Sequence, residues 1–283
     1  MTRLRDRMRG LVVAAARHLP DGLVLDLLGS LSLHRRLDYA GADLFLKVET
    51  PEEYHVRLGS CKKEPETVAW IENALREGDV FYDVGANVGA YTLVASQAAG
   101  GGVKVYAFEP GFTNYAKLCQ NVQLNRCQRN VVPLPIALAA RTRFGRLVFS
   151  NLHAGPTTRL GNGNGEKSAA GQAIEQTIPT WRLDDLRREL GMEPPSLMKI
   201  DVDGAELEVL RGAPETLRDP ALRAVQIELE TDETAGHYPE VVGELEKAGF
   251  VLEAKYPHFR YANYLFVRRP KTTPPHQAKE LTS

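Results

Sequence analysis

The sequence is poor in cysteine, which excludes two classes of small stabilised fold. It has three cysteines in 283 residues, an odd number, and none of them belongs to a Cys-x-x-Cys pair. A disulfide framework or a zinc knot needs more cysteines at closer spacing. We therefore expect a protein of the reducing cytoplasm.

Net charge is nearly absent as well. The 35 lysines and arginines are balanced by 36 aspartates and glutamates, which leaves a net charge of -1 at pH 7. Binding to nucleic acid depends on a broad positive field that neutralises phosphates. We expect no nucleic-acid partner.

A long hydrophobic run is missing from the beginning of the sequence. The apolar residues 11–16 are followed directly by Arg17 and His18. A membrane-spanning helix needs about 20 apolar residues and a signal peptide about 7 to 15, so this run is too short for the first and marginal for the second. We expect neither export nor a membrane span from this segment.

The same segment has a second interpretation. Arginines at positions 3, 5, 7 and 9 could make it a basic amphipathic helix that lies on a membrane surface. Asp6, Asp21 and Asp26 weaken that basic face. We therefore favour a helix that caps the main domain or contacts another subunit.

From residue 65 onward, apolar runs of strand length alternate with helical patterns, which predicts a parallel sheet with helices on both faces. The predicted strands are 80–84, 103–108, 131–138, 197–202 and 224–229, with a closing pair at 250–255 and 264–267. The predicted helices are 66–76, 90–98, 114–124 and 205–211. We expect a doubly wound, mostly parallel α/β domain over residues 61–269, a helical N-terminal extension over 1–60 and a disordered tail over 270–283.

Residues 161–171 interrupt this alternation with a stretch rich in Gly, Asn and Ser. It has too little apolar surface to pack, so we expect a loop. The loop is either a lid that orders over a bound ligand or a solvated insertion without a role. Residues 151–172 and 231–239, together with the N-terminal extension, are the segments expected to build a substrate pocket if the protein has one.

The most informative stretch is VFYDVGANVG, residues 80–89. A buried strand leads into a Gly-rich turn, and the turn opens a helix near Tyr91. Glu109 follows 20 residues after Gly89, at the end of the next apolar run, as a ribose-binding carboxylate does in βαβ nucleotide sites. The spacing predicts a nucleotide-containing cofactor, although the glycines could also serve the turn alone.

Charge indicates which cofactor this is. A dinucleotide site needs a second glycine where the backbone meets the pyrophosphate, and Asn87 stands in that place. Asp83 would repel a pyrophosphate but would attract the ammonium group of a methionine moiety. S-adenosylmethionine has that ammonium, a ribose diol and no phosphate, so the charges favour a methyl donor over NAD. An NAD-dependent oxidoreductase is the alternative.

Three sequence blocks in order resemble the FkbM family of S-adenosylmethionine-dependent methyltransferases. They are VFYDVGANVGAYTLVAS at 80–96, VYAFEP at 105–110 and MKIDVDGAELEVLRGA at 198–213. The resemblance runs from about residue 64 to 266. It implies a class I Rossmann-like fold and O-methylation of a hydroxyl on a natural product, sugar or glycolipid. It also suggests that adenine lies beside Ile136 and Ala137.

Ligands in open α/β sheets bind at the carboxyl ends of the strands, which ranks the candidate residues. The expected cofactor-binding residues are Glu64, Asp83, Gly85, Ala86, Asn87, Gly89, Glu109, Pro110, Ile136 and Ala137. Glu64 has an equally good interpretation as a charge at a helix start, and Glu109 could be a surface charge before Pro110.

Asp201 and Lys199 are the predicted catalytic pair. They lie two residues apart on one face of a strand, and Asp201 stands at the strand end. An aliphatic hydroxyl needs a base to take its proton, or a metal to lower its pKa. Asp201 could supply either chemistry, or could be only the structural partner of Lys199.

A divalent metal such as Mg²⁺ is a further option, with Asp201 and Glu228 as its ligands. We do not favour it, because the positive charges of the donor already account for nearby carboxylates. A protein that binds the donor but serves only as an interaction subunit is the remaining alternative.

For three other acidic residues and three histidines we expect structural or surface positions and no catalytic role. Asp203 and Glu206 have the spacing of an N-cap and its N3 partner, and Asp184 is predicted to cap the helix after Trp181. The histidines at 153, 237 and 258 are alternative bases on loops, but we interpret them as surface residues.

Overall fold

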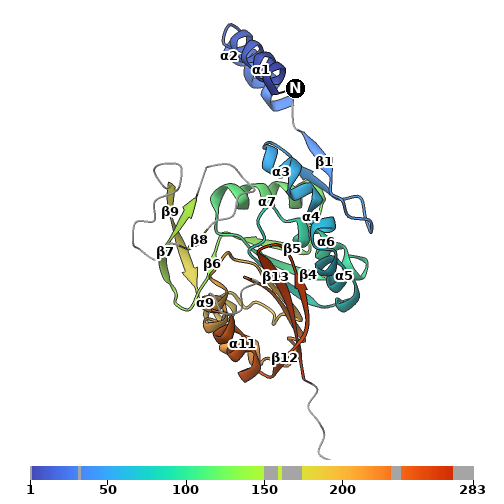
Figure 1. The fold of residues 1–283 in the computed structure, drawn as a ribbon, viewed down its shortest axis with the longest axis vertical. Helices are drawn as coiled ribbons and strands as arrows, with labels where there is room; N and C mark the ends of the chain where they lie inside the picture. The colour runs from blue at the N-terminus through green and yellow to red at the C-terminus, as the bar shows by residue number, and fades with distance from the viewer. Residues whose placement is uncertain (1, 31–32, 150–158, 161–173, 231–236, 270–283) are drawn as a thin grey trace, which may run out of the picture.

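The computed structural model describes residues 2–30, 33–149, 159–160, 174–230 and 237–269 (Figure 1). Its largest sheet has seven strands in the order β12-β13-β11-β10-β3-β4-β5. These are β3 (Val80–Val84), β4 (Lys104–Phe108), β5 (Val131–Leu134), β10 (Leu197–Ile200), β11 (Ala224–Glu230), β12 (Phe250–Pro257) and β13 (Tyr261–Arg268). Six strands run in the same direction, and only β13, which lies between β11 and β12, runs antiparallel to them. The predicted doubly wound fold is confirmed.

Helices cover both faces of this sheet because its strands are apolar on both sides. In β3, Phe81 belongs to one buried cluster and Tyr82 to the other. The first cluster packs against α5 (Pro65–Ala74), α6 (Ala90–Gln97) and α7 (Phe112–Leu124). The second packs against α8 (Leu183–Leu190), α9 (Glu206–Arg211), α10 (Pro214–Arg218) and α11 (Tyr238–Lys247). The strand and helix bounds differ from the predicted ones by up to three residues, apart from the strand predicted at 131–138.

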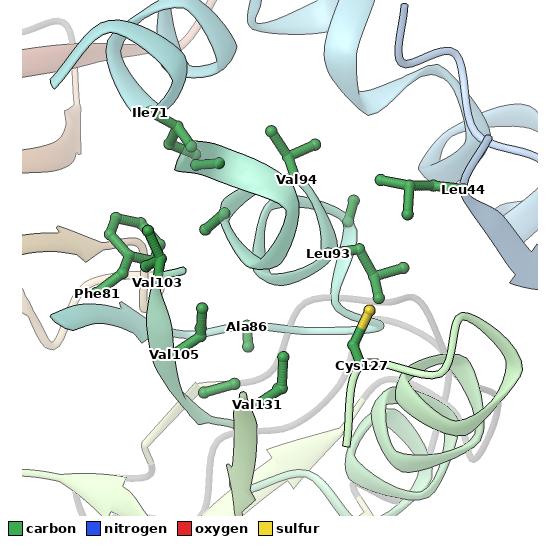
Figure 2. Close-up of a cluster of buried hydrophobic side chains, with 14 of the residues drawn as sticks. Leu44, Ile71, Phe81, Ala86, Leu93, Val94, Val103, Val105, Cys127 and Val131 are labelled. Carbon is green, nitrogen blue, oxygen red and sulfur yellow. The ribbon is translucent and has the colours of Figure 1, made fainter. Parts of the chain in front are cut away.

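Figure 2 shows the first cluster. Leu93 and Val94 of α6 lie above sheet residues that include Phe81 and Val105. Leu44, which comes from the segment before the catalytic domain, reaches the same cluster. The apolar core therefore extends beyond the predicted domain boundary.

The strand predicted at 131–138 is wrong as a single element. Residues 131–134 form β5, whereas β6 (Ala137–Leu138) joins a separate four-stranded sheet. That sheet has the order β6-β9-β7-β8 and also contains β7 (Arg143–Phe149), β8 (Arg159–Leu160) and β9 (Ile174–Trp181). Pro135 lies at the break between the two strands. The predicted loop at 161–171 and the predicted tail at 270–283 lie outside the described residues.

The N-terminal region has two parts. Helices α1 (Thr2–Ala16) and α2 (Asp21–Ser30) lie at one end of the molecule, away from the seven-stranded sheet (Figure 1). The second part, from residue 33, contains β1 (His34–Arg36), β2 (Phe45–Lys47), α3 (Pro51–His55), the 3-10 helix η1 (Arg57–Gly59) and α4 (Ser60–Lys63). Across the described ranges, no helix has the length and apolar character needed to cross a membrane.

The second part packs onto the catalytic domain through α7. The backbone N–H of Phe45 donates to Asn125 Oδ1 (2.8 Å), and that of Lys47 donates to Asn121 Oδ1 (2.7 Å). Leu37, Leu44 and Leu46 are buried in the first cluster. Residues 33–60 are therefore continuous in packing with the domain predicted to start at 61.

Two capping predictions are wrong in detail. Helix α9 has Ala205 at its N-cap and no side-chain cap, and Glu206 instead accepts a hydrogen bond from the Gly204 N–H (2.9 Å). Asp184 does not cap its own helix. Its carboxylate accepts from the backbone N–H groups of Glu215 (2.8 Å) and Thr216 (2.9 Å), and so it caps the neighbouring helix α10.

Candidate active site

A cleft lies where β3, β4 and β10 end, which is the edge that holds ligands in this fold class. It contains about 650 Å³ of empty space, part of it open to solvent. Its lining residues are Arg57, Val84, Gly85, Asn87, Phe108, Glu109, Pro110, Ile136, Ala137, Leu138, Leu147, Asp201, Val202, Asp203 and Ala205.

The cleft brings together seven of the predicted site residues. They are Gly85, Asn87, Glu109, Pro110, Ile136, Ala137 and Asp201. Five others, Glu64, Asp83, Ala86, Gly89 and Lys199, are not among its lining residues. Seven of the twelve predicted residues therefore line one cleft, and the binding and catalytic roles of all twelve stay predictions.

Only glycine fits the backbone conformation and the space at position 85. Its φ is +86°, and a Cβ atom there would lie 1.8 Å from the carbonyl oxygen of Asp201. The absence of a side chain lets β3 and β10 approach at the floor of the cleft. Gly89, with φ of +93°, likewise leaves room for Leu118 of α7.

Glu109 is held by the turn that it faces. Its two carboxylate oxygens accept hydrogen bonds from the backbone N–H groups of Asn87 and Gly111, both at 2.8 Å. The side chain is buried, and this burial raises the pKa of the Glu109 carboxyl to about 7. The fixed carboxylate at the end of β4 can accept hydroxyl groups of a ribose when it is ionised.

Asp201 and Lys199 form an ion pair at the end of β10. Lys199 Nζ lies 2.7 Å from Asp201 Oδ2, and the Lys199 side chain is only 2% exposed. Burial acts to raise the pKa of Asp201, but the Lys199 ammonium outweighs it and leaves that pKa lowered. Burial likewise acts to lower the pKa of Lys199, whereas Asp201, Asp83 and Glu64 keep it raised. The pair is ionised at neutral pH.

Asp83 lies behind the cleft. It is buried, and it accepts a hydrogen bond from Thr92 Oγ1 at 2.5 Å. Burial raises its pKa, although Lys199 opposes this shift. Its contact with the ammonium group of a donor stays a prediction.

Glu64 and Glu228 also lie outside the cleft. Glu64 is buried and pairs with Lys63 at 3.0 Å. Burial, followed by the charge of Asp201, raises the pKa of Glu228 to about 9. Among the residues that the structure describes, no three or more His, Cys, Asp or Glu side chains are grouped to hold a metal.

The cleft also contains residues that the sequence analysis missed. Arg57 comes from η1, and it is the one cation among the described lining residues. Its charge acts to lower the pKa of both Glu109 and Asp201. Leu147 comes from β7 of the smaller sheet. No nearby motif marks either residue, whereas Phe108 and Val202 could have been found as neighbours of predicted residues.

Comparison with known proteins decides the family. The family profile described as "Methyltransferase FkbM domain" matches residues 83–252. The chain belongs to the FkbM methyltransferase family. This confirms the resemblance of the three sequence blocks and identifies the chain as an S-adenosylmethionine-dependent methyltransferase with a Rossmann-like sheet.

Two relatives and one solved structure illustrate the similarity. Hexuronic acid methyltransferase AglP of Haloferax volcanii is 29% identical over 176 residues, covering 62% of this chain and 67% of the relative. The 31-O-demethyl-FK506 methyltransferase FkbM of Streptomyces tacrolimicus is 32% identical over 205 residues, which cover 64% of this chain and 76% of the relative. The crystal structure of methyltransferase FkbM from Methylobacillus flagellatus has a TM-score of 0.49 at 14% identity. That match covers 78% of this chain and 48% of the solved one, so the chain spans about half of it.

Proposed function

We propose that this methyltransferase transfers the methyl group of S-adenosylmethionine to a hydroxyl group of a small molecule or carbohydrate. The observation that carries the proposal is that two carboxylates line the same cleft. Glu109 accepts hydrogen bonds from two backbone N–H groups, and Asp201 forms an ion pair with Lys199. The name of one relative, 31-O-demethyl-FK506 methyltransferase, supports oxygen as the acceptor atom, and the name hexuronic acid methyltransferase supports a carbohydrate acceptor.

The residues of the cleft fit the donor. Gly85 and Asn87 present backbone at the methionine side, and Glu109 is placed to accept the ribose hydroxyls. Apolar side chains form the wall on which an adenine ring can lie, as expected for its flat faces. The wall residues are Phe108, Ile136, Leu138 and Leu147.

In this proposal the chain's own residues align and deprotonate the acceptor. When bound, S-adenosylmethionine supplies a methyl group on a sulfonium sulfur, which keeps the electron pair as a neutral sulfide. Asp201 accepts a hydrogen bond from the acceptor hydroxyl and takes its proton as the oxygen bonds to carbon. Lys199 is the positioning residue that holds Asp201 ionised and oriented. The lowered pKa makes Asp201 a weak base, so alignment contributes most of the rate increase.

The donor and the reaction are tested separately. Calorimetry should detect binding of S-adenosylmethionine and S-adenosylhomocysteine and no binding of NADH. Absence of binding to folded protein would remove the proposal. A mass-spectrometric screen of sugars and hydroxylated natural products should then find an acceptor that gains one methyl group. Donor binding without turnover on any acceptor would instead support the donor-binding interaction subunit.

We also propose that the enzyme works in a reducing compartment, namely the cytoplasm. Support comes from the three cysteines, all of which are free thiols, two of them buried. A thiol reagent should react with all three cysteines of the unfolded protein and with fewer than three of the native protein.

A further inference from the structure

The helices α1 and α2, here called the helical arm (residues 2–30), expose apolar side chains that the catalytic domain does not cover. The arm side chains that the structure describes are those of residues 7, 8 and 10–27, and none of them is buried. Leu11 is 72% exposed, and Val12 and Leu25 are each 67% exposed. Globular domains rarely present so many large apolar side chains together unless something binds them.

In α1 these side chains form one stripe. Met8, Leu11, Val12 and Ala15 have the spacing i, i+3, i+4 and i+7, which places them along one side of a helix. Figure 1 places this helix far from the two larger sheets. The stripe is therefore available to a surface outside the molecule.

Charge indicates the nature of that surface. Residues 1–36 contain seven arginines against three aspartates, whereas residues 37–283 contain 28 basic and 33 acidic residues. Residues 1–36 thus have a net charge of +4, from α1, Arg17 and β1, although α2 is acidic and the whole chain is nearly neutral. Arg35 and Arg36 of β1 are both exposed, and Arg36 also pairs with Asp43.

We propose that the helical arm docks this methyltransferase on an anionic lipid bilayer, with its apolar stripe in the interface and its arginines among the headgroups. An amphipathic helix with arginines beside an apolar stripe has the composition of an interfacial helix. Each arginine near a negatively charged surface adds to the attraction. The proposal concerns attachment and does not depend on the proposed methyl transfer.

A second copy of the chain is the competing occupant. It would bring an equally basic arm against the first, and like charges placed opposite each other oppose association. An anionic bilayer satisfies the apolar stripe and the positive charge at once. Charge complementarity therefore favours lipid.

Sedimentation of the full chain with vesicles tests the proposal. We expect binding to phosphatidylglycerol–phosphatidylcholine vesicles, weakened by salt, and at least about tenfold weaker binding to phosphatidylcholine alone. The double variant Leu11→Glu/Val12→Glu should lower binding by about tenfold or more, because both side chains lose their apolar contact with lipid. Phe259→Glu is the matched control, since Phe259 is 93% exposed but lies in the β12–β13 hairpin.

Each other outcome overturns the proposal. No binding, equal binding to neutral and anionic vesicles, or an equal loss with Phe259→Glu would each contradict it. A dimer in light scattering that Leu11→Glu/Val12→Glu dissociates, without vesicle binding, would assign the stripe to a second copy. Donor affinity of the double variant should equal that of the unchanged chain, which shows that the fold is intact and keeps the result separate from the proposed function.

Discussion

Gly85 is the residue at which a single added methyl group has the largest expected effect. Alanine there needs a positive φ and would collide with the Asp201 carbonyl oxygen. Gly78 is the matched control, because its φ is also positive (+82°) but nothing lies within 4 Å of an added Cβ. We expect Gly78→Ala to cost about 1–2 kcal/mol of unfolding free energy from the dihedral alone. Gly85→Ala should cost more and should also weaken donor binding.

Urea unfolding and calorimetric titration of both variants measure this difference. Equal unfolding free energies, with donor affinity retained by Gly85→Ala, would show that β10 can move away from the turn without consequence.

Glu109 makes donor binding depend on pH near neutrality. Its carboxyl has a pKa of about 7, above the ordinary value of 4.5, and must be ionised to accept two ribose hydroxyls. Donor affinity should therefore fall as the pH drops below about 7, and binding at pH 6 should release a proton. Calorimetry in buffers of different ionisation enthalpy measures that proton, and Glu109→Gln should abolish both the proton release and the pH dependence.

The same raised pKa has an effect on stability of the donor-free protein. Because the folded state prefers protonated Glu109, this stabilisation is present below pH 4.5 and is lost as the pH rises through about 7. Glu109→Gln should flatten the free energy of unfolding over that window. If the free energy of unfolding of Glu109→Gln still changes with pH as steeply as before, other titratable groups determine this pH dependence.

Asp201 is expected to affect turnover and not donor affinity. Asp201→Asn keeps the shape of the side chain but cannot take a proton, so kcat should fall by about 10² to 10⁴. Asp185→Asn is the control, because Asp185 is a partly exposed carboxylate that binds Thr142 away from the cleft. Normal turnover in Asp201→Asn would reduce Asp201 to a structural partner of Lys199.

Lys199 acts through Asp201, and its variant should change a pH profile. Lys199→Gln removes the ammonium that lowers the pKa of Asp201, so the acidic limb of the kcat profile should move to higher pH. A fall in activity with no shift of that limb would indicate a merely structural role.

At the scale of elements, the side-chain amide of Asn125 forms the hydrogen bonds with β2 that a neighbouring strand would otherwise form. Its amide accepts from the Phe45 N–H (2.8 Å) and donates to the Phe45 carbonyl (2.7 Å). Asn125→Ala should lower the unfolding free energy by about 1–3 kcal/mol, because both groups lose these bonds in a partly buried place. Asn73→Ala, which removes an exposed bond within α5, should change it by less than about 0.5 kcal/mol. Chemical denaturation measures the unfolding free energy of both variants. Equal small losses would mean that water replaces the hydrogen bonds of the Asn125 amide.

The elements that could be predicted are those specified by neighbouring residues. The turn at Gly85 and the strand end at Glu109 follow from spacing within about 25 residues, so their positions in the cleft could be inferred. Arg57 reaches the cleft only because residues 33–60 pack onto α7, a long-range contact without a local pattern. The break between β5 and β6 was missed for the same reason, since β6 pairs with β9 some 40 residues later.

At the scale of the whole molecule, the N-terminal region divides into a part that the fold needs and a part that it does not. A chain lacking residues 2–30 should keep its melting temperature and donor affinity, because the described side chains of that segment are not buried. A chain lacking residues 2–60 would lose Leu37, Leu44 and Leu46 from the core and Arg57 from the cleft. We expect it to unfold or aggregate, and circular dichroism with calorimetry distinguishes the two deletions. A stable chain without residues 2–60 would restore the boundary at residue 61.

Strand β13 has a consequence for synthesis on the ribosome. It follows β11 and β12 in the sequence but lies between them in the sheet. Until residues 261–268 leave the exit tunnel, β11 has an open edge and β12 has no neighbour to join. A premature stop codon before residue 261 removes only 23 residues of this sequence, yet it leaves a nascent chain with an unpaired hydrophobic edge. Capture by chaperones and degradation, not a slightly shortened enzyme, is the fate to expect of such a product.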